Sequence, residues 1–185
     1  TVTVTTLDVS VHGYWNAYGQ DPGDMDGDGR PDILALSHDR AILYDPATGA
    51  PRLTSPDISP IPFGSAQLAL ADVDGDGRDE AIVASNMAGG LFATAKRFGV
   101  LEVESGALSA RWQVFIDPTA GQHRFVRRPY ADLVAGGALE LFHSVHEPAT
   151  GWTTRIYAGD ASTGTPLITL PDRVAVGSAD LDGDG

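Results

Sequence analysis

Short apolar runs separated by glycine, proline and aspartate make up most of the chain, and none has the length of a helix. Gly or Pro interrupts nearly every longer stretch, and no segment keeps an apolar period of about 3.6 residues. The apolar runs instead have the length of strands, which predicts an all-β protein. The runs that carry this prediction are residues 33–36, 66–71, 81–84 and 139–142.

Residues 1–11 alternate between apolar and polar positions, but the alternation slips once. Val2 and Val4 fall on one face of an extended strand, whereas the apolar positions from Leu7 onward are one step out of phase. Because side chains alternate between the two faces of a strand, this slip predicts a β-bulge near residues 5–6 or a change of sheet.

Three further segments pair a β-type run with a turn and a second short run. They lie at residues 42–49, 100–106 and 156–164, and each turn ends in Gly. This pattern is typical of a β-hairpin. The sequence therefore predicts a hairpin downstream of the runs 33–36, 81–84 and 139–142.

An aspartate-rich segment recurs at near-regular spacing along the chain. Copies occupy residues 24–32, 72–80 and 180–185, and their starts are 48 and 108 residues apart. The larger gap predicts a missing copy midway, and residues 131–141 supply it. In that copy Val134 and Gly136 replace inner carboxylates, so we interpret it as a repeat that has lost its ion.

Units of about 50 residues with four short strands each are typical of β-propeller blades. The fold prediction is a partial β-propeller of about three four-stranded blades plus the start of a fourth. Because the last aspartate segment stops in mid-loop, we interpret the chain as a piece of a longer polypeptide whose remainder completes the propeller. The predicted boundaries are 1–12 for an N-terminal strand, 13–59 for a blade with loop 24–32, 60–116 for a blade with loop 72–80, 117–171 for a blade with degenerate loop 132–140, and 172–185 for the start of the next blade with a truncated loop at 180–185.

Charge and composition narrow the possible partners. The 185 residues contain 25 acidic and 12 basic side chains, a formal net charge of -13, and no Cys. Twelve of the 25 carboxylates lie in the three aspartate segments, so the negative charge is local. This balance argues against nucleic acid as a partner, and no apolar run has the roughly 20 residues of a membrane span. Disulfides and thiolate metal sites are excluded.

The spacing of the carboxylates predicts an all-oxygen cation site. Carboxylates at the first, third and fifth loop positions can converge if the backbone curls tightly, and glycines at the fourth and sixth positions permit the positive φ angles that such a curl needs. Flexible oxygen ligands suit Ca²⁺ better than Mg²⁺, zinc or copper. An EF-hand is excluded, because its twelfth position requires Glu and here carries Ala35 or Val83.

The segments 23–34 and 63–83 resemble the FG-GAP or VCBS-type repeats of integrin α-chain propellers and of many bacterial surface and secreted proteins. The resemblance implies a calcium-binding propeller, with ligation by side chains at the first, third, fifth and ninth loop positions and by the carbonyl of the seventh. The Gly-Ala-Pro of the family is replaced by residues 36–38 and 84–86, and Pro22 stands where the first strand should enter the loop. The implied ligands are Asp24, Asp26, Asp28, Arg30, Asp32, Asp72, Asp74, Asp76, Arg78, Glu80, Asp180, Asp182 and Asp184.

Other candidate residues carry less specific patterns. His143 and His146 are three residues apart, which on a strand places them on opposite faces and disfavours a shared zinc. The aromatic residues Tyr14, Trp15, Tyr18, Trp112 and Trp152 could stack on sugar rings, but such residues more often fill space between sheets. The basic cluster His123, Arg124, Arg127 and Arg128 could bind an acidic sugar, but a solvated strand face is the simpler interpretation.

The functional prediction is a binding, adhesion or scaffold module of a secreted or cell-surface protein, with structural Ca²⁺ and no catalytic constellation. The alternatives are the propeller part of a calcium-dependent polysaccharide lyase resembling the rhamnogalacturonan lyases, or a lectin-like carbohydrate binder. Because free Ca²⁺ is abundant outside cells and scarce in the cytosol, an extracellular, cell-surface or periplasmic location is expected.

Overall fold

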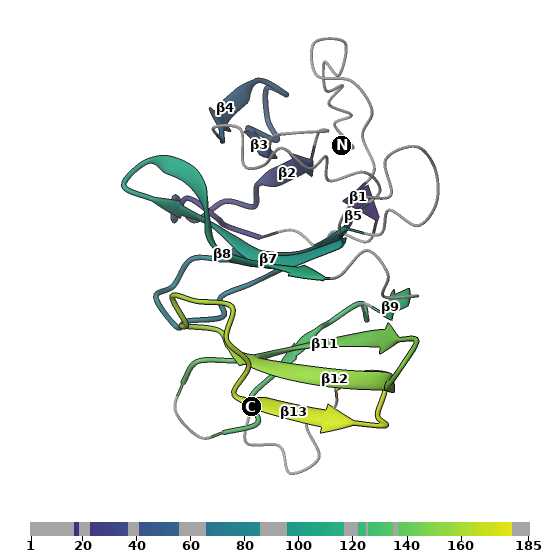
Figure 1. Ribbon diagram of the computed structural model, residues 1–185. Coiled ribbons are helices and arrows are strands. Elements are labelled where there is room, and N and C mark those ends of the chain that lie inside the picture. Colours follow the sequence, from purple (N-terminus) through teal and green to yellow (C-terminus); the bar gives the residue numbers. More distant parts are fainter. Residues whose placement is uncertain are drawn as a thin grey trace, which may run out of the picture.

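The computed structural model describes residues 17–18, 23–36, 41–55, 66–85, 96–116, 122–124, 126–134 and 137–178. All regular secondary structure in these residues is β-strand, which confirms the all-β prediction. The strands form three sheets. Figure 1 shows these sheets stacked one after another, in the order of the sequence.

The first sheet has the order β2-β3-β4. It consists of β2 (Ile33–Leu36), β3 (Ala41–Tyr44) and β4 (Pro51–Thr54), all antiparallel. The predicted hairpin joins β3 to β4. In its turn the carboxylate of Asp45 accepts hydrogen bonds from the backbone N–H groups of Ala47 and Thr48, at 2.7 and 3.0 Å.

The middle sheet has the order β1-β5-β6-β7-β8. The short β1 (Ala17–Tyr18) runs parallel to β5 and the other neighbours are antiparallel. The remaining strands are β5 (Ala66–Ala71), β6 (Glu80–Ser85), β7 (Lys96–Glu104) and β8 (Ala107–Ile116).

The last sheet has the order β10-β11-β12-β13, and β9 also pairs with β11. All of its pairings are antiparallel. Its strands are β9 (Gln122–Arg124), β10 (Tyr130–Ala131), β11 (Glu140–Glu147), β12 (Gly151–Ala158) and β13 (Ile168–Pro171).

Both faces of the middle sheet are buried, because alternate side chains of its strands enter two different apolar clusters. On β6, Ala81 and Val83 pack toward the first sheet with Met25, Leu34 and Leu43. On the same strand, Ile82 and Ala84 pack in a second cluster toward the last sheet, which contains Phe98, Trp112, Leu141 and Tyr157. The stack is therefore held together by two apolar layers between three sheets.

The aromatic residues at the second layer pack closely. The ring of Phe98 stacks on that of His143 with centroids 4.5 Å apart, and the rings of Trp112 and Tyr157 stack at 5.2 Å. Trp112 is 5% exposed and His143 is fully buried. Trp112 thus fills space between sheets, and His143 belongs to the core.

Most predicted strands lie where the sequence places them. The runs 33–36 and 66–71 are β2 and β5, and 81–84 lies within β6. The predicted run 139–142 starts one residue too early, since β11 begins at Glu140, and β7 and β8 are longer than the short strands expected. The predicted strand at 1–12 lies outside the described residues.

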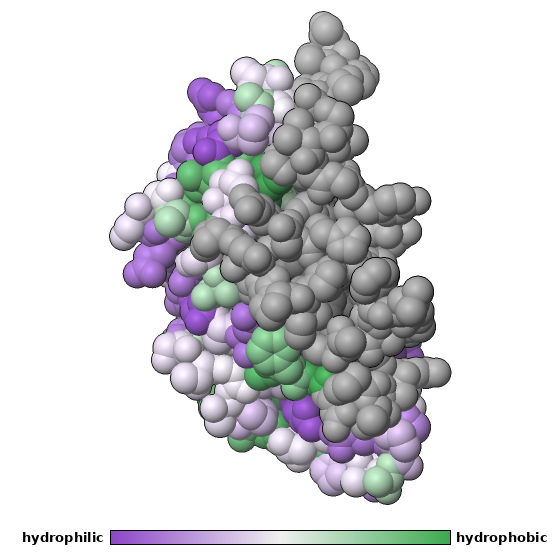
Figure 2. Space-filling view, turned by 45° about the horizontal axis from the view of Figure 1, so that its top comes forward, coloured by the Kyte–Doolittle hydropathy of each residue, from purple (hydrophilic) through white to green (hydrophobic). Residues whose placement is uncertain are grey.

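On the surface view of Figure 2, apolar side chains of the described residues show in separate patches among hydrophilic ones. The exposed large apolar residues include Leu167, Ile168 and Val176, on or near β13. Among the described residues, no helix has the length and hydropathy needed to cross a membrane.

Candidate metal centre

The first aspartate loop, called loop 1 (residues 24–32), is closed at its base by an antiparallel bridge between Gly23 and Asp32. The N–H of Asp32 donates to the carbonyl of Gly23 at 2.6 Å. Inside the loop, Met25 is fully buried in the apolar layer between the first two sheets. An apolar second position therefore anchors the loop to the core and leaves the acidic positions near the surface.

Asp24 organises the backbone of loop 1. Its Oδ1 accepts hydrogen bonds from the N–H of Gly27 at 2.8 Å and of Asp28 at 3.1 Å, and its Oδ2 accepts one from the N–H of Gly29 at 2.7 Å. Gly27 and Gly29 have φ angles of 75° and 81°, as the sequence predicted. The loop thus curls around the carboxylate of its first residue.

Loop 2 (residues 72–80) repeats this geometry between β5 and β6. The carboxylate of Asp72 accepts hydrogen bonds from the N–H groups of Gly75 at 2.8 Å and Gly77 at 3.0 Å. Val73 is fully buried, like Met25 in loop 1. The φ angles of Gly75 and Gly77 are 80° and 89°. Two segments that start 48 residues apart in the sequence therefore adopt the same backbone geometry.

Three carboxylates converge in each loop. Asp24, Asp26 and Asp32 each offer a carboxylate oxygen, with the oxygens within 4.8 Å of one another, and Asp72, Asp74 and Glu80 do the same. These are the first, third and ninth predicted positions. The fifth positions, Asp28 and Asp76, each use one oxygen to accept the N–H of the seventh residue, at 3.0 and 2.8 Å. That seventh residue is Arg30 in loop 1 and Arg78 in loop 2, and both are exposed.

The ninth residue of each loop is buried, unlike the other acidic positions. Asp32 and Glu80 are each 2% exposed, and each accepts a hydrogen bond at 3.0 Å from the N–H of the second loop residue. Burial raises the pKa of Asp32, and the nearby charge of Asp26 raises it further. Burial also raises the pKa of Glu80 to about 7. Both carboxylates would therefore gain from a bound cation.

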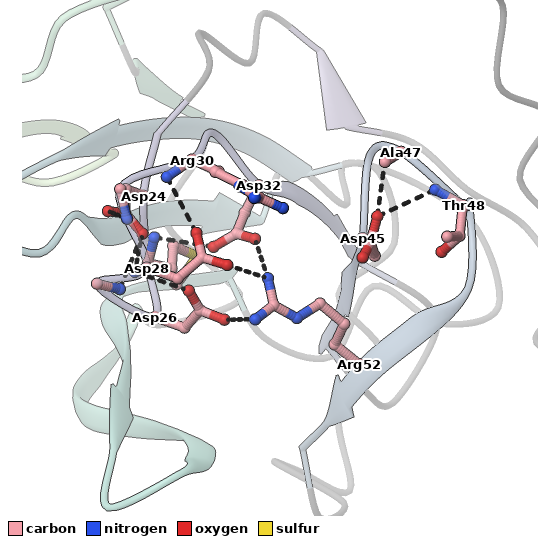
Figure 3. A network of polar contacts seen from close by, with 12 residues as sticks. Asp24, Asp26, Asp28, Arg30, Asp32, Asp45, Ala47, Thr48 and Arg52 are labelled. Carbon is pink, nitrogen blue, oxygen red and sulfur yellow. Dashed lines mark hydrogen bonds and ion pairs between the residues drawn. The ribbon is translucent and has the colours of Figure 1, made fainter.

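Arg52 of β4 supplies positive charge to loop 1. Figure 3 shows its guanidinium pointing into the carboxylate cluster, with an ion pair to Asp26. Its Nη1 also lies 3.3 Å from Oδ2 of Asp28 and 3.3 Å from Oδ1 of Asp32. One guanidinium therefore faces three of the carboxylates of loop 1.

Arg111 of β8 has the corresponding place at loop 2, and it also reaches the next sheet. Its Nη2 lies 2.7 Å from Asp74 and 3.4 Å from Glu80, and its Nε donates to Glu102. Its Nη1 donates to the carbonyl of Gly159 at 3.0 Å. Burial alone would lower the pKa of Arg111, but the bond to Glu102 and the surrounding carboxylates raise it overall.

In the degenerate segment, loop 3 (residues 132–140, described for 132–134 and 137–140), the ninth residue accepts a hydrogen bond from the N–H of the second residue, as in loops 1 and 2. The buried carboxylate of Glu140 accepts hydrogen bonds from the N–H groups of Leu133 at 2.7 Å and Val134 at 3.1 Å. The side chains of Leu133 and Val134 are more than half exposed. Val134 thus stands where loops 1 and 2 have an acidic third residue, whereas Leu133 is exposed where their second residue is buried.

The remaining predicted residues divide between described and undescribed parts of the chain. Asp180, Asp182 and Asp184 lie outside the described residues, as do Tyr14 and Trp15. His143 and His146 both lie on β11, one buried and one half-buried. Within the described residues, the groups able to hold a metal consist of Asp and Glu alone.

Arg52, Arg111 and Asp79 also belong to the site, although no pattern in the sequence indicates them. The two arginines lie on the last strand of their sheets, and each reaches a loop 20 or more residues away. Only a recurring Arg on that strand could have indicated them. Asp79 contacts the backbone of Asp24 across 55 residues, a pairing that no local pattern encodes.

The donor set fits a hard divalent cation. Each loop brings together carboxylate oxygens, without a nitrogen or sulfur donor in the cluster, on a backbone whose glycines hold the curled shape. Such oxygen-only, flexible sites suit Ca²⁺. Asp24, Asp26 and Asp32 would hold the ion in loop 1, and Asp72, Asp74 and Glu80 would hold it in loop 2.

Two solved structures with a similar fold are both described as rhamnogalacturonan lyases. They are YesW, with 14% sequence identity and a TM-score of 0.56, and the PL11 enzyme of Bacillus licheniformis, with 16% identity and a TM-score of 0.57. Each alignment covers 92% of this chain and 38% of the other chain. At these identities the likeness shows a shared fold, and the chain spans well under half the length of these structures.

The family comparison is more specific. No curated protein matches the chain. The family described as FG-GAP-like repeat matches residues 5–83, a range that contains loops 1 and 2. Over residues 5–83 this match confirms the FG-GAP-type resemblance of the aspartate segments.

Proposed function

We propose that loops 1 and 2 bind Ca²⁺ and that the ions have a structural role. The observation that carries this proposal is the convergence of three carboxylates in each loop, one of them buried. Two carboxylates about 4 Å apart repel by about 4 kcal/mol at an effective dielectric near 20. A divalent cation would replace this repulsion by attraction and fix the loop between its flanking strands.

We further propose that the three sheets are successive blades of a partial propeller, with the boundaries given by the sequence repeats except that β1 pairs with the middle sheet. The face-to-face stack with two apolar layers supports this arrangement, as does the similar fold of much longer chains. In this arrangement loop 3 is the counterpart that binds no ion, because Val134 and Gly136 replace the carboxylates of its third and fifth positions. The segment 180–185 would form a further loop.

The propeller segment would act as a scaffold or binding module of a secreted or cell-surface protein, where Ca²⁺ is abundant enough to fill the loops. The second candidate is the propeller part of a polysaccharide lyase. The two similar solved structures favour it over an adhesion role, because both are described as rhamnogalacturonan lyases. A protein or carbohydrate ligand of the segment is not specified by the loops themselves.

Calcium removal and readdition test the structural role. Stripping the protein with a chelator should lower its melting temperature, and readding Ca²⁺ should restore it, whereas a protein with both Asp26→Asn and Asp74→Asn should not respond. An unchanged melting temperature in the unmodified protein would reject the proposal. Incubation with rhamnogalacturonan tests the second candidate, since a lyase releases unsaturated products that absorb in the ultraviolet.

A further inference from the structure

Loops 1 and 2 are joined directly by the side chain and backbone of Asp79. The N–H of Asp24 donates to Oδ2 of Asp79 at 2.7 Å, and the N–H of Asp79 donates to the carbonyl of Asp24 at 2.9 Å. This reciprocal pair, called the Asp79 bridge, links residues that are 55 positions apart. It crosses from the middle sheet to the loop that precedes the first sheet.

The surrounding packing is built around the bridge. A Cβ atom added to Gly23 would lie 2.7 Å from Oδ2 of Asp79 and 2.8 Å from Cβ of Leu70. Gly23 therefore allows the two loops to approach, and any larger residue would push Asp79 away. A second contact lies nearby, since a Cβ on Gly27 would meet the side chain of Arg78 at 3.0 Å.

The bridge connects the two proposed metal sites through adjacent residues. Asp24 is the first ligand position of loop 1, and its carboxylate also organises three backbone N–H groups of that loop. Asp79 stands between Arg78 and Glu80, the seventh and ninth positions of loop 2. Its own carboxylate faces Asp24 rather than the carboxylates of loop 2, so Asp79 is not one of the three converging residues.

We propose that Asp79 is a positioning residue that couples the two ion sites, so that filling one site strengthens binding at the other. This inference rests on the calcium binding proposed above. An ion in loop 1 fixes the backbone of Asp24, and the bridge then holds Asp79 and the adjoining Glu80 in the arrangement that loop 2 needs. The second ion consequently pays less of the cost of ordering its loop. By thermodynamic reciprocity, an ion in loop 2 favours binding in loop 1 by the same factor.

Hydrogen–deuterium exchange measured by mass spectrometry can test the coupling between the two sites, because peptides within 23–36 and 66–85 report on the two loops separately. The protein is titrated with Ca²⁺ alone, and the concentration that gives half-maximal protection is measured for each loop. Four proteins form a double-mutant cycle: unmodified, Asp26→Asn, Asp79→Ala, and the combination. Asp26→Asn weakens loop 1 without touching loop 2 or the bridge.

With the bridge intact, Asp26→Asn should raise the half-protection concentration of loop 2 by about fivefold or more, the lower end of usual coupling between sites. In the protein that also carries Asp79→Ala, Asp26→Asn should shift the half-protection concentration of loop 2 by less than about twofold. Without metal, Asp79→Ala should also speed exchange in the 23–36 peptides. Gly23→Ala, which displaces Asp79 sterically, should reproduce the loss of coupling.

Asp160→Ala is the matched control, because it removes a negative charge beside loop 2, next to Gly159, which packs against Val73. It should leave the coupling unchanged. The proposal is overturned if loop 2 fills at the same Ca²⁺ concentration whatever the state of loop 1, or if the shift persists without Asp79. If neither loop responds to Ca²⁺ at all, metal binding itself fails, which is a different outcome from two sites that fill independently.

Discussion

Replacing Glu80 by Gln should have opposite effects on two quantities. It should raise the stability of the metal-free protein at about pH 8 and reduce the stabilisation by Ca²⁺. Glu80 is 2% exposed, and its pKa is about 7 in the folded protein against an ordinary value of 4.5. Desolvation is the main cause, and the charges of Asp74 and Asp76 add to it. Gln has the same shape, and its amide oxygen can still accept the N–H of Val73, which now lies 3.0 Å from Glu80.

The direction of the effect follows from proton linkage. Because the folded protein holds the Glu80 proton more tightly than the unfolded chain does, the contribution of Glu80 to stability is fully present below pH 4.5 and is lost as the pH rises through about 7. At about 1.36 kcal/mol per pH unit, the metal-free protein should lose about 3 kcal/mol from this residue. Glu80→Gln has no proton to lose, so it should remove this part of the pH dependence.

Saturating Ca²⁺ should reverse the order of stability of the unmodified protein and the Glu80→Gln variant. At about 1,000 times the dissociation constant, a ligand that binds only the folded state adds about 4.1 kcal/mol to stability, which exceeds the loss of about 3 kcal/mol from Glu80. The unmodified protein should gain this from loop 2, whereas Glu80→Gln, with a neutral ninth position, should gain little. Without metal at about pH 8, the variant should be the more stable protein; with saturating Ca²⁺, it should be the less stable one.

Urea denaturation followed by circular dichroism measures these free energies, in metal-stripped and calcium-loaded samples at about pH 5 and pH 8. Glu140→Gln is the matched control, because Glu140 has the same position in loop 3 and should not affect the calcium response. The reasoning is refuted if Glu80→Gln keeps the full pH dependence of the metal-free protein. It is equally refuted if the variant keeps the full stabilisation by Ca²⁺.

Three further substitutions test other parts of the structure. Arg111→Ala should destabilise the metal-free protein by about 2 kcal/mol, because Asp74 and Glu102 lose their partner, and Ca²⁺ should recover part of this loss in urea titrations. Gly77→Ala should cost about 1–2 kcal/mol from backbone strain alone, since its φ is 89° and nothing lies within 4 Å of the added Cβ; an unchanged urea midpoint would contradict the loop geometry. Phe98→Ala should cost about 3–5 kcal/mol, because Phe98 is fully buried between two sheets, and a loss below about 1 kcal/mol would argue against that aromatic layer.

The local parts of the structure could be predicted from the sequence. The positive φ angles of Gly27 and Gly29 follow from the Asp-Gly spacing, because only residues within one loop determine them. Strands β2 and β5 were placed correctly, because uninterrupted apolar runs mark them. Strands β7 and β8 were placed too short, because Gly99 breaks the apolar run of β7. Gly99 in fact packs within the sheet, where an added Cβ would lie 2.7 Å from the carbonyl of Trp112.

The contacts between units could not be predicted in the same way. Arg111 meets Asp74 across 37 residues, and Asp79 meets Asp24 across 55. Both contacts depend on how strands pair and how sheets stack, and neither leaves a periodic signal in the sequence. The convergence of the first, third and ninth carboxylates of each loop could therefore be predicted from the sequence. The arginines and Asp79, which connect the loops to their surroundings, became visible only in the folded chain.

Isothermal titration calorimetry with Ca²⁺ tests the central claim most directly. The account predicts saturable binding by the metal-stripped protein, with one binding event lost in Asp26→Asn, another lost in Asp74→Asn, and both lost when the two changes are combined. Heat that does not saturate, or a titration that the combined variant leaves unchanged, would contradict the claim that these two loops are calcium sites.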